Sequence, residues 1–119
     1  MPIERHGTTR RYSDVVVHAD TVYLVEVPHT LNADISTQTR EVLASVERLL
    51  AQAGSDKTRL LQATLYLPDM ADYDAMNAVW DDWLPAGAAP VRACVSARLA
   101  NPGYRLDVVV VAARGATPG

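Results

Sequence analysis

The sequence predicts a single α+β domain with the element order ββαβαββ. Runs of β-branched and aromatic residues near both ends of the chain indicate strands. Between them lie two stretches with apolar residues at helical spacing, on either side of a further strand. The length of 119 residues is that of one domain, 1–119, and a composition that is 49% hydrophobic and 21% charged is typical of a globular protein.

Two strands are predicted first. Residues 11–18 (RYSDVVVH) and 21–27 (TVYLVEV) are rich in β-branched and aromatic side chains, which pack well on a pleated sheet. The two residues between them, Ala19 and Asp20, fit the short turn of a hairpin.

The first helix is predicted over residues 34–53. Asp34 or Ser36 can cap its first turn with a side-chain oxygen, and Gly54 is typical of a helix end. Apolar residues recur on one face at helical spacing, and they are Val42, Leu43, Val46, Leu49, Leu50 and Ala53.

A strand over residues 59–67 (RLLQATLYL) and a second helix follow. Pro68-Asp69 indicates a turn, Asp72 begins the helix, and Pro85 and Gly87 end it. The apolar face of this helix consists of Tyr73, Met76, Trp80, Trp83 and Leu84.

Residues 91–98 and 104–113 are predicted as the last two strands, joined by the Asn-Pro-Gly turn at 101–103. Helices that separate strands in this order lie together on one face of a mixed sheet. Val108, Val110 and the apolar content of both sides of the last strand predict that the opposite face is buried too, against copies of the same chain. Residues 115–119 are expected to form a loose tail.

Several classes of function are disfavoured. Cys94 is the only cysteine, and the three histidines lie in separate segments, so we expect no disulfide within the chain and no metal site. A net charge of −3 argues against binding to nucleic acid, which depends on clustered lysine and arginine. The longest apolar run, Val108 to Ala113, is far shorter than a membrane span of about 20 residues, and the N-terminus has no apolar signal core. We expect a cytosolic protein.

Arg92 is the residue that most strongly suggests a function. It stands in the apolar run PVRACV, residues 90–95, where a buried guanidinium without a partner would be costly. The strand period places it on the same face as Cys94 and Ser96. Two interpretations are open: a structural ion pair with an Asp or Glu of the chain, or a clamp for the anionic group of a ligand.

Two carboxylates in apolar strands raise a similar choice. Asp107 stands among valines in the last strand, and Glu26 stands in the second strand. Either can be the structural partner of an arginine. In a cleft with Arg92, Asp107 can instead position water or pass protons, because burial moves the pKa of a carboxyl group towards neutrality.

The remaining candidates have a packing interpretation as well. Asn77 interrupts the apolar face of the second helix, where an amide usually caps or braces a neighbouring loop. Cys94 is interpreted as a small buried hydrophobe, although an arginine two residues away can activate a thiol. The aromatic residues interpreted as core, rim or helix packing are Tyr12, Tyr23, Trp80 and Trp83.

These residues resemble the reactive-intermediate deaminases, also called the RidA or YjgF family, over nearly the whole chain. The resemblance rests on RYSDVVVH and VYLVEVP near the start, on QTREVLASVERLLAQAGSDKTRLLQATLYLPDMADYDAMNAVW in the middle, and on APVRACV and YRLDVVVVAAR near the end. Its most specific part is the Pro-x-Arg-x-Cys pattern with an acid fifteen residues after the arginine, Arg92 to Asp107.

The resemblance implies a chorismate-mutase-like fold and a homotrimer with clefts between adjacent subunits. It implies the hydrolysis of small-molecule enamines and imines, such as 2-aminoacrylate and other 2-imino acids, to 2-oxo acids and ammonia without a cofactor. In this sequence Arg92 resembles the residue that binds the substrate carboxylate, and Cys94 the residue whose main chain meets the imine nitrogen. Asp107 takes the place of an acid that orients water, Tyr12 that of an aromatic wall, and Asn77 that of a cleft asparagine.

The chain departs from the family pattern at two cleft positions. Asp107 stands where a glutamate is usual, and Val25-Glu26 stands where a small hydroxyl residue and a glycine are common. Two alternative functions therefore stay open. One is a binding protein or sensor for 2-oxo acids, which Glu26 favours. The other is an endoribonuclease or translation inhibitor, which the acidic net charge and the lack of a histidine pair disfavour.

Overall fold

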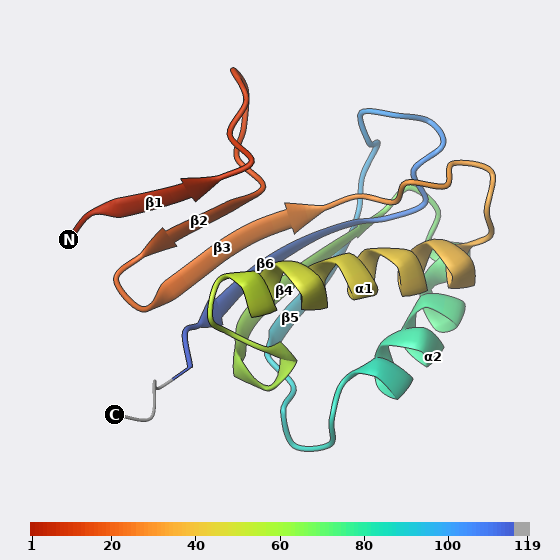
Figure 1. The fold of residues 1–119 in the computed structure, drawn as a ribbon. Coiled ribbons are helices and arrows are strands. Elements are labelled where there is room, and N and C mark those ends of the chain that lie inside the picture. The colour runs from red at the N-terminus through yellow and green to blue at the C-terminus, as the bar shows by residue number, and fades with distance from the viewer. Residues whose placement is uncertain (116–119) are drawn as a thin grey trace.

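A computed structural model describes residues 1–115 as one six-stranded mixed sheet with two helices on one of its faces (Figure 1). The strands are Ile3–His6 (β1), Val15–His18 (β2), Thr21–Glu26 (β3), Leu60–Leu67 (β4), Val91–Ser96 (β5) and Asp107–Ala113 (β6). They lie in the order β1-β2-β3-β6-β4-β5. The helices are Ile35–Gln52 (α1) and Tyr73–Trp83 (α2), and short 3-10 turns at Lys57–Arg59 and Met70–Asp72 precede β4 and α2. The predicted α+β class is confirmed.

The core lies between the helices and the sheet face that they cover. α1 buries the whole apolar face predicted for it, and α2 buries Met76 and Trp80. Every second strand residue points into this core, as the period of a strand requires. These strand residues are Val15, Val17, Val22, Leu24, Ala63, Leu65, Leu67, Val108, Val110 and Ala112.

Both helix starts contain aspartates, but they are used differently. Of the two residues predicted to cap α1, Asp34 does so, with its Oδ1 accepting from the Thr37 amide at 2.8 Å. Gly54 follows the last turn with a φ of 81°, a left-handed conformation that suits glycine. Asp72 stands at the start of α2 without capping it, and its carboxylate instead lies 3.5 Å from Arg105 Nε.

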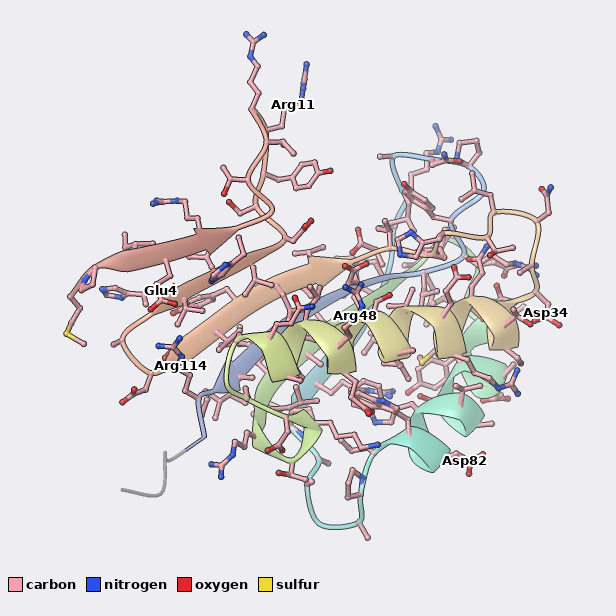
Figure 2. The ribbon with its side chains drawn as sticks, viewed as in Figure 1. Glu4, Arg11, Asp34, Arg48, Asp82 and Arg114 are labelled. Carbon is pink, nitrogen blue, oxygen red and sulfur yellow. The ribbon has the colours of Figure 1, made fainter. Side chains whose placement is uncertain are left out.

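The predicted hairpin is formed by β2 and β3, with its turn at Ala19. β2 begins at Val15 rather than at residue 11, because the Thr9 amide donates to the Tyr12 carbonyl at 2.7 Å and closes a turn there. The loop that contains this turn projects from the sheet, with Arg11 near its tip (Figure 2).

The sequence prediction missed β1. This strand pairs antiparallel with β2 and is exposed along its full length, so it has no alternating buried residues that could have revealed it. Glu4 of β1 accepts from Arg114 Nη2 at 3.0 Å and ties this edge strand to the end of β6 (Figure 2).

The last two strands do not form a hairpin with each other. β5 pairs in parallel with β4, whereas β6 pairs antiparallel with both β3 and β4 and lies between them. The predicted turn is present, since the Tyr104 amide donates to the Asn101 carbonyl at 3.0 Å. It belongs to a longer connection, 97–106, because the chain must pass from the edge of the sheet to its centre.

The face of the sheet away from the helices is apolar and uncovered in the single chain. Val108 and Val110, which suggested a second buried face, point towards the helices; the open face carries the alternate residues Val109 and Val111. Residues of β1, β3 and β5 with large exposed fractions extend this surface, namely Ile3 (49%), Tyr23 (46%), Val25 (48%), Val91 (74%) and Val95 (42%).

Residues 1–115 include no helix long and apolar enough to cross a bilayer. The tail expected at 115–119 lies outside the described residues except for Gly115. The amide of Gly115 donates to the Gly54 carbonyl at 2.7 Å, so this first residue is held in place.

Candidate functional site

Arg92 lies on β5 at the edge of the sheet and points towards α2. Its register partner on β4 is the buried Ala63, which places the arginine on the face that the helices cover. The guanidinium carbon lies 5.2 Å from the centre of the Trp80 ring and 5.9 Å from that of Tyr73, both on α2. Its Nη2 donates to Tyr73 Oη at 3.4 Å, a long hydrogen bond.

Arg92 has no carboxylate partner within residues 1–115. Five ion pairs of 4.0 Å or less occur there, and none of them involves this arginine. Stacking on aromatic rings stabilises the guanidinium through its face and leaves most of its in-plane N–H donors free. Of the two interpretations of Arg92, a structural ion pair within the chain is therefore not what this structure contains.

Arg92 lines a cavity of about 360 Å³ between α2 and β5. The other residues of its wall are Asn77, Trp80 and Asp81 from α2, and Ala89 and Pro90 from the connection to β5. Asn77 does not brace a loop through its side-chain oxygen as expected, because its Oδ1 is buried without a hydrogen-bond donor. Arg92 and Asn77 thus line the same cavity, with the Asn77 Oδ1 itself buried.

Cys94 follows on the same face of β5, where it packs against the core. Burial raises the pKa of its thiol, although the charge of Arg92 acts in the opposite direction. The thiol therefore has no enhanced tendency to ionise, which agrees with the prediction of a small hydrophobe.

Asp107 lies on the opposite face of the sheet from Arg92. It begins β6 and pairs with Tyr66, and it shares the open face with Val109. It is half-buried, its Oδ1 has no hydrogen-bond partner among residues 1–115, and burial raises the pKa of its carboxyl group. Within one chain the two predicted catalytic residues therefore do not meet.

Glu26 is also separated from Arg92. It ends β3, which is three strands away from β5, or about 14 Å at the usual strand spacing. Burial raises the pKa of Glu26, and the nearby charge of Asp14 adds to this effect while those of His29 and Arg48 oppose it. In one chain its carboxylate therefore lies among these groups rather than beside Arg92.

Arg92, Cys94 and Asn77 thus lie together at the β5 edge. Glu26 and Asp107 lie on the adjacent strands β3 and β6 but on opposite faces of the sheet. Glu26 pairs with the buried Val108 on the face that the helices cover, whereas Asp107 lies on the open face. Tyr12, 63% exposed, lies in the loop that connects β1 and β2, the two strands at the other edge of the sheet.

Comparison with known proteins gives a consistent result. The family described as Endoribonuclease L-PSP matches residues 3–114. The RutC family protein YoaB of Escherichia coli is 45% identical over 113 residues, which cover 95% of this chain and 99% of that protein. The chain belongs to the RutC/YjgF family.

Solved structures of the YjgF family have the same fold. A family member from Neisseria meningitidis is 44% identical and superimposes with a TM-score of 0.95, with 98% of each chain covered. A protein from Pseudomonas aeruginosa is 40% identical with a TM-score of 0.93, and covers 96% of this chain and 100% of its own. The family and the chorismate-mutase-like fold expected from the sequence are therefore confirmed.

Two features of this candidate site were missed in the sequence. One is that Trp80, predicted only to pack, also supports Arg92 together with Tyr73. The other is Asp81, which follows Asn77 by one helical turn and so lies on the same side of α2. The four-residue spacing of Asn77 and Asp81 is present in the sequence. It indicates a shared site only because β5 lies against this side of α2.

Proposed function

We propose that this protein hydrolyses 2-imino acids and their enamine tautomers to 2-oxo acids and ammonia. The observation that carries the proposal is Arg92. Its guanidinium lies on two aromatic rings at the wall of a cavity and has no carboxylate partner in residues 1–115. A planar guanidinium with free donors matches a carboxylate in bidentate geometry, and each such charge-assisted bond contributes about 1.5–3 kcal/mol.

The reaction needs little from the protein beyond positioning. In the protonated substrate, C2 is bonded to an iminium nitrogen and is already electrophilic. Water adds to C2, and one of its protons passes to the nitrogen by way of a base. The C–N bond then breaks to release ammonia, and the second proton of the water passes from the C2 hydroxyl to that ammonia as the C=O bond forms. The products are the 2-oxo acid and ammonium, so atoms and charge balance. Holding the carboxylate on Arg92 and a water next to C2 lowers the entropic part of the barrier.

Asp107 is assigned the role of orienting that water. A half-buried carboxylate whose pKa is raised by burial is a better proton acceptor than an exposed one. Since it faces away from the Arg92 of its own chain, the proposal requires that each cleft combine Arg92, Asn77 and Cys94 of one copy with Asp107, Glu26 and Tyr12 of another. A trimer with clefts between neighbouring copies meets this requirement.

The direct test is a coupled assay in which an amino-acid oxidase generates 2-imino acids in the presence of the protein. Arg92→Ala and Arg92→Lys should both lose the accelerated hydrolysis while keeping the fold. Lysine keeps the charge but lacks the planar fork, so this variant tests bidentate recognition. Arg59→Ala, which removes an exposed arginine of a 3-10 turn, is the control and should retain activity. Wild-type rates in both Arg92 variants would show that Arg92 is structural.

Glu26 favours one alternative, a protein that binds 2-oxo acids in the same clefts without turnover. In that case a 2-oxo acid would bind in an Arg92-dependent manner, as measured by calorimetry, while the imine would decay at the same rate with and without protein.

A further inference from the structure

We propose that Asp81 makes the Arg92 cavity selective for 2-imino acids whose side chain ends in a cation. This inference rests on the proposed function, because it names the class of substrate that the same cavity takes. It starts from the charges in the cavity wall, where Arg92 of β5 and Asp81 of α2 are the two charged residues.

The two charges line one cavity without neutralising each other. Neither residue takes part in an ion pair of 4.0 Å or less among residues 1–115. Arg92 lies over the rings of Tyr73 and Trp80, which stabilise its charge without a carboxylate. The cavity is therefore polarised, and each of its charges is available to a ligand.

Asn77 lines the same cavity from α2, one helical turn before Asp81. Its Oδ1 is buried and has no donor within residues 1–115, so it accepts a hydrogen bond from a ligand N–H only if the amide turns towards the cavity. The carboxylate and the imino nitrogen of a 2-imino acid are attached to adjacent carbon atoms, so they suit an arginine and a neighbouring amide oxygen. These two contacts would use Arg92 and Asn77, and Asp81 would remain available to the side chain of the 2-imino acid.

Helix geometry sets the distance to the side-chain group. Asn77 and Asp81 are four residues apart on α2, which is a rise of about 6 Å. A group that reaches Asp81 from the imino carbon must therefore lie several bonds along the side chain. The 2-imino acid derived from arginine has a guanidinium at such a distance, whereas the one derived from norleucine has a methyl group.

The neighbouring acid provides a matched control. Asp82 lines a different hollow, a cavity of about 550 Å³ between α1 and α2, where Arg40, Arg48 and Trp83 also contribute to the wall. Asp82 projects outward from α2 in Figure 2. Loss of its charge alters the net charge of the helix as much as loss of the Asp81 charge does, without changing the Arg92 cavity.

The experiment measures kcat/KM for the imines that an amino-acid oxidase forms from L-arginine and from L-norleucine. Wild type should prefer the arginine-derived imine by about threefold or more, the scale of a partly exposed ion pair, and added salt should weaken this preference. Asp81→Asn should bring the ratio close to one by slowing the arginine-derived imine more than the norleucine-derived imine, and Asp82→Asn should keep the wild-type ratio. A ratio that Asp81→Asn leaves unchanged, with turnover that still depends on Arg92, would overturn the selectivity and leave the proposed function intact.

A binding measurement separates the two proposals if neither imine is turned over. Calorimetry would then compare the corresponding 2-oxo acids, 2-oxo-5-guanidinopentanoate and 2-oxohexanoate, with wild type and Asp81→Asn. A preference for the guanidino acid that disappears in Asp81→Asn would support the role of Asp81 even though hydrolysis had failed. Equal affinities for the two acids in wild type would overturn it.

Discussion

Arg92 can serve a ligand because its own chain stabilises it without neutralising it. Trp80 is 5% exposed and Tyr73 is 37% exposed, so the guanidinium lies on a platform that is buried at one end and reachable at the other. Aromatic faces attract a cation but do not use its N–H groups. A carboxylate in place of these rings would form an ion pair with Arg92, and the guanidinium would then not be available to the carboxylate of a ligand.

The pKa of Asp107 predicts an unusual effect on stability. Because burial raises this pKa above its ordinary value of 3.8, the folded chain holds the proton more tightly than the unfolded chain does. The contribution of Asp107 to stability is thus present below pH 3.8 and is lost as the pH rises through the raised value. Asp107→Asn should therefore stabilise the fold at pH 7 by about 1 kcal/mol, the scale of a polar group buried without a partner, and should have little effect at pH 3.

Urea unfolding of both proteins at the two pH values, at equal protein concentration, tests this prediction. Asp107→Asn should also hydrolyse imines more slowly, because an amide cannot accept a proton from water as a carboxylate can. A gain in stability with a loss of activity is common for residues of an active site. A loss of stability at pH 7 would mean instead that the Asp107 carboxylate has a cationic partner in the assembled protein.

Glu26 gives a separate prediction about affinity. If its carboxylate reaches the Arg92 of a neighbouring copy, it competes with the substrate carboxylate, and separating a buried ion pair is costly. Glu26→Gly should then bind 2-oxobutyrate more tightly than wild type and hydrolyse a wider range of imines. Calorimetric titration of 2-oxobutyrate into both proteins decides this, and equal affinities would show that Glu26 does not compete for Arg92.

At the scale of elements, one residue of α1 holds two connections of the chain in place. The Gln38 side chain is fully buried; its Nε2 donates to the carbonyls of Thr30 at 3.0 Å and Gly103 at 2.9 Å, and its Oε1 accepts from the Arg105 amide at 2.8 Å. These contacts join the connection before α1 to the connection before β6. They place the start of β6, and with it Asp107.

Gln38→Leu should destabilise the fold by about 2–3 kcal/mol, because it leaves buried backbone groups without partners. Gln52→Leu, at the exposed end of the same helix, is the control and should change stability little. Urea unfolding measures both. A cost for Gln38→Leu no larger than that for Gln52→Leu would contradict this role.

The elements that could be predicted from the sequence are those defined by local patterns. The apolar face of α1 and the alternation in β4 are readable without knowing any partner. The exposed β1 has no such pattern, and the position of β6 between β3 and β4 depends on contacts between distant segments. The site divides in the same way. Arg92 was identifiable as a charge in an apolar strand, whereas its aromatic platform and Asp81 depend on α2 lying against β5.

At the scale of the whole molecule, the sheet is two-sided but only one side is covered in the single chain. Its open face carries Val109, Val111 and Val25. Arg92 lies on the edge strand β5, whereas Asp107 and Glu26 lie on the interior strands β6 and β3. If copies associate through this face and bring the β5 edge of one copy next to β3 and the β1–β2 loop of another, then burial of the valines and completion of the site are a single event.

We therefore predict a trimer in solution, with a mass by light scattering about three times the chain mass of 12.9 kDa at micromolar concentration. Val109→Lys places a charge in the centre of the open face, where burial would be costly, so this variant should shift towards monomer. It should lose imine hydrolysis in proportion, because each cleft needs two copies. Ala44→Lys, on the outer side of α1, is the control and should remain trimeric and active. A monomeric wild type would remove the shared cleft, and an active monomeric Val109→Lys would show that Arg92 works without residues of a second copy.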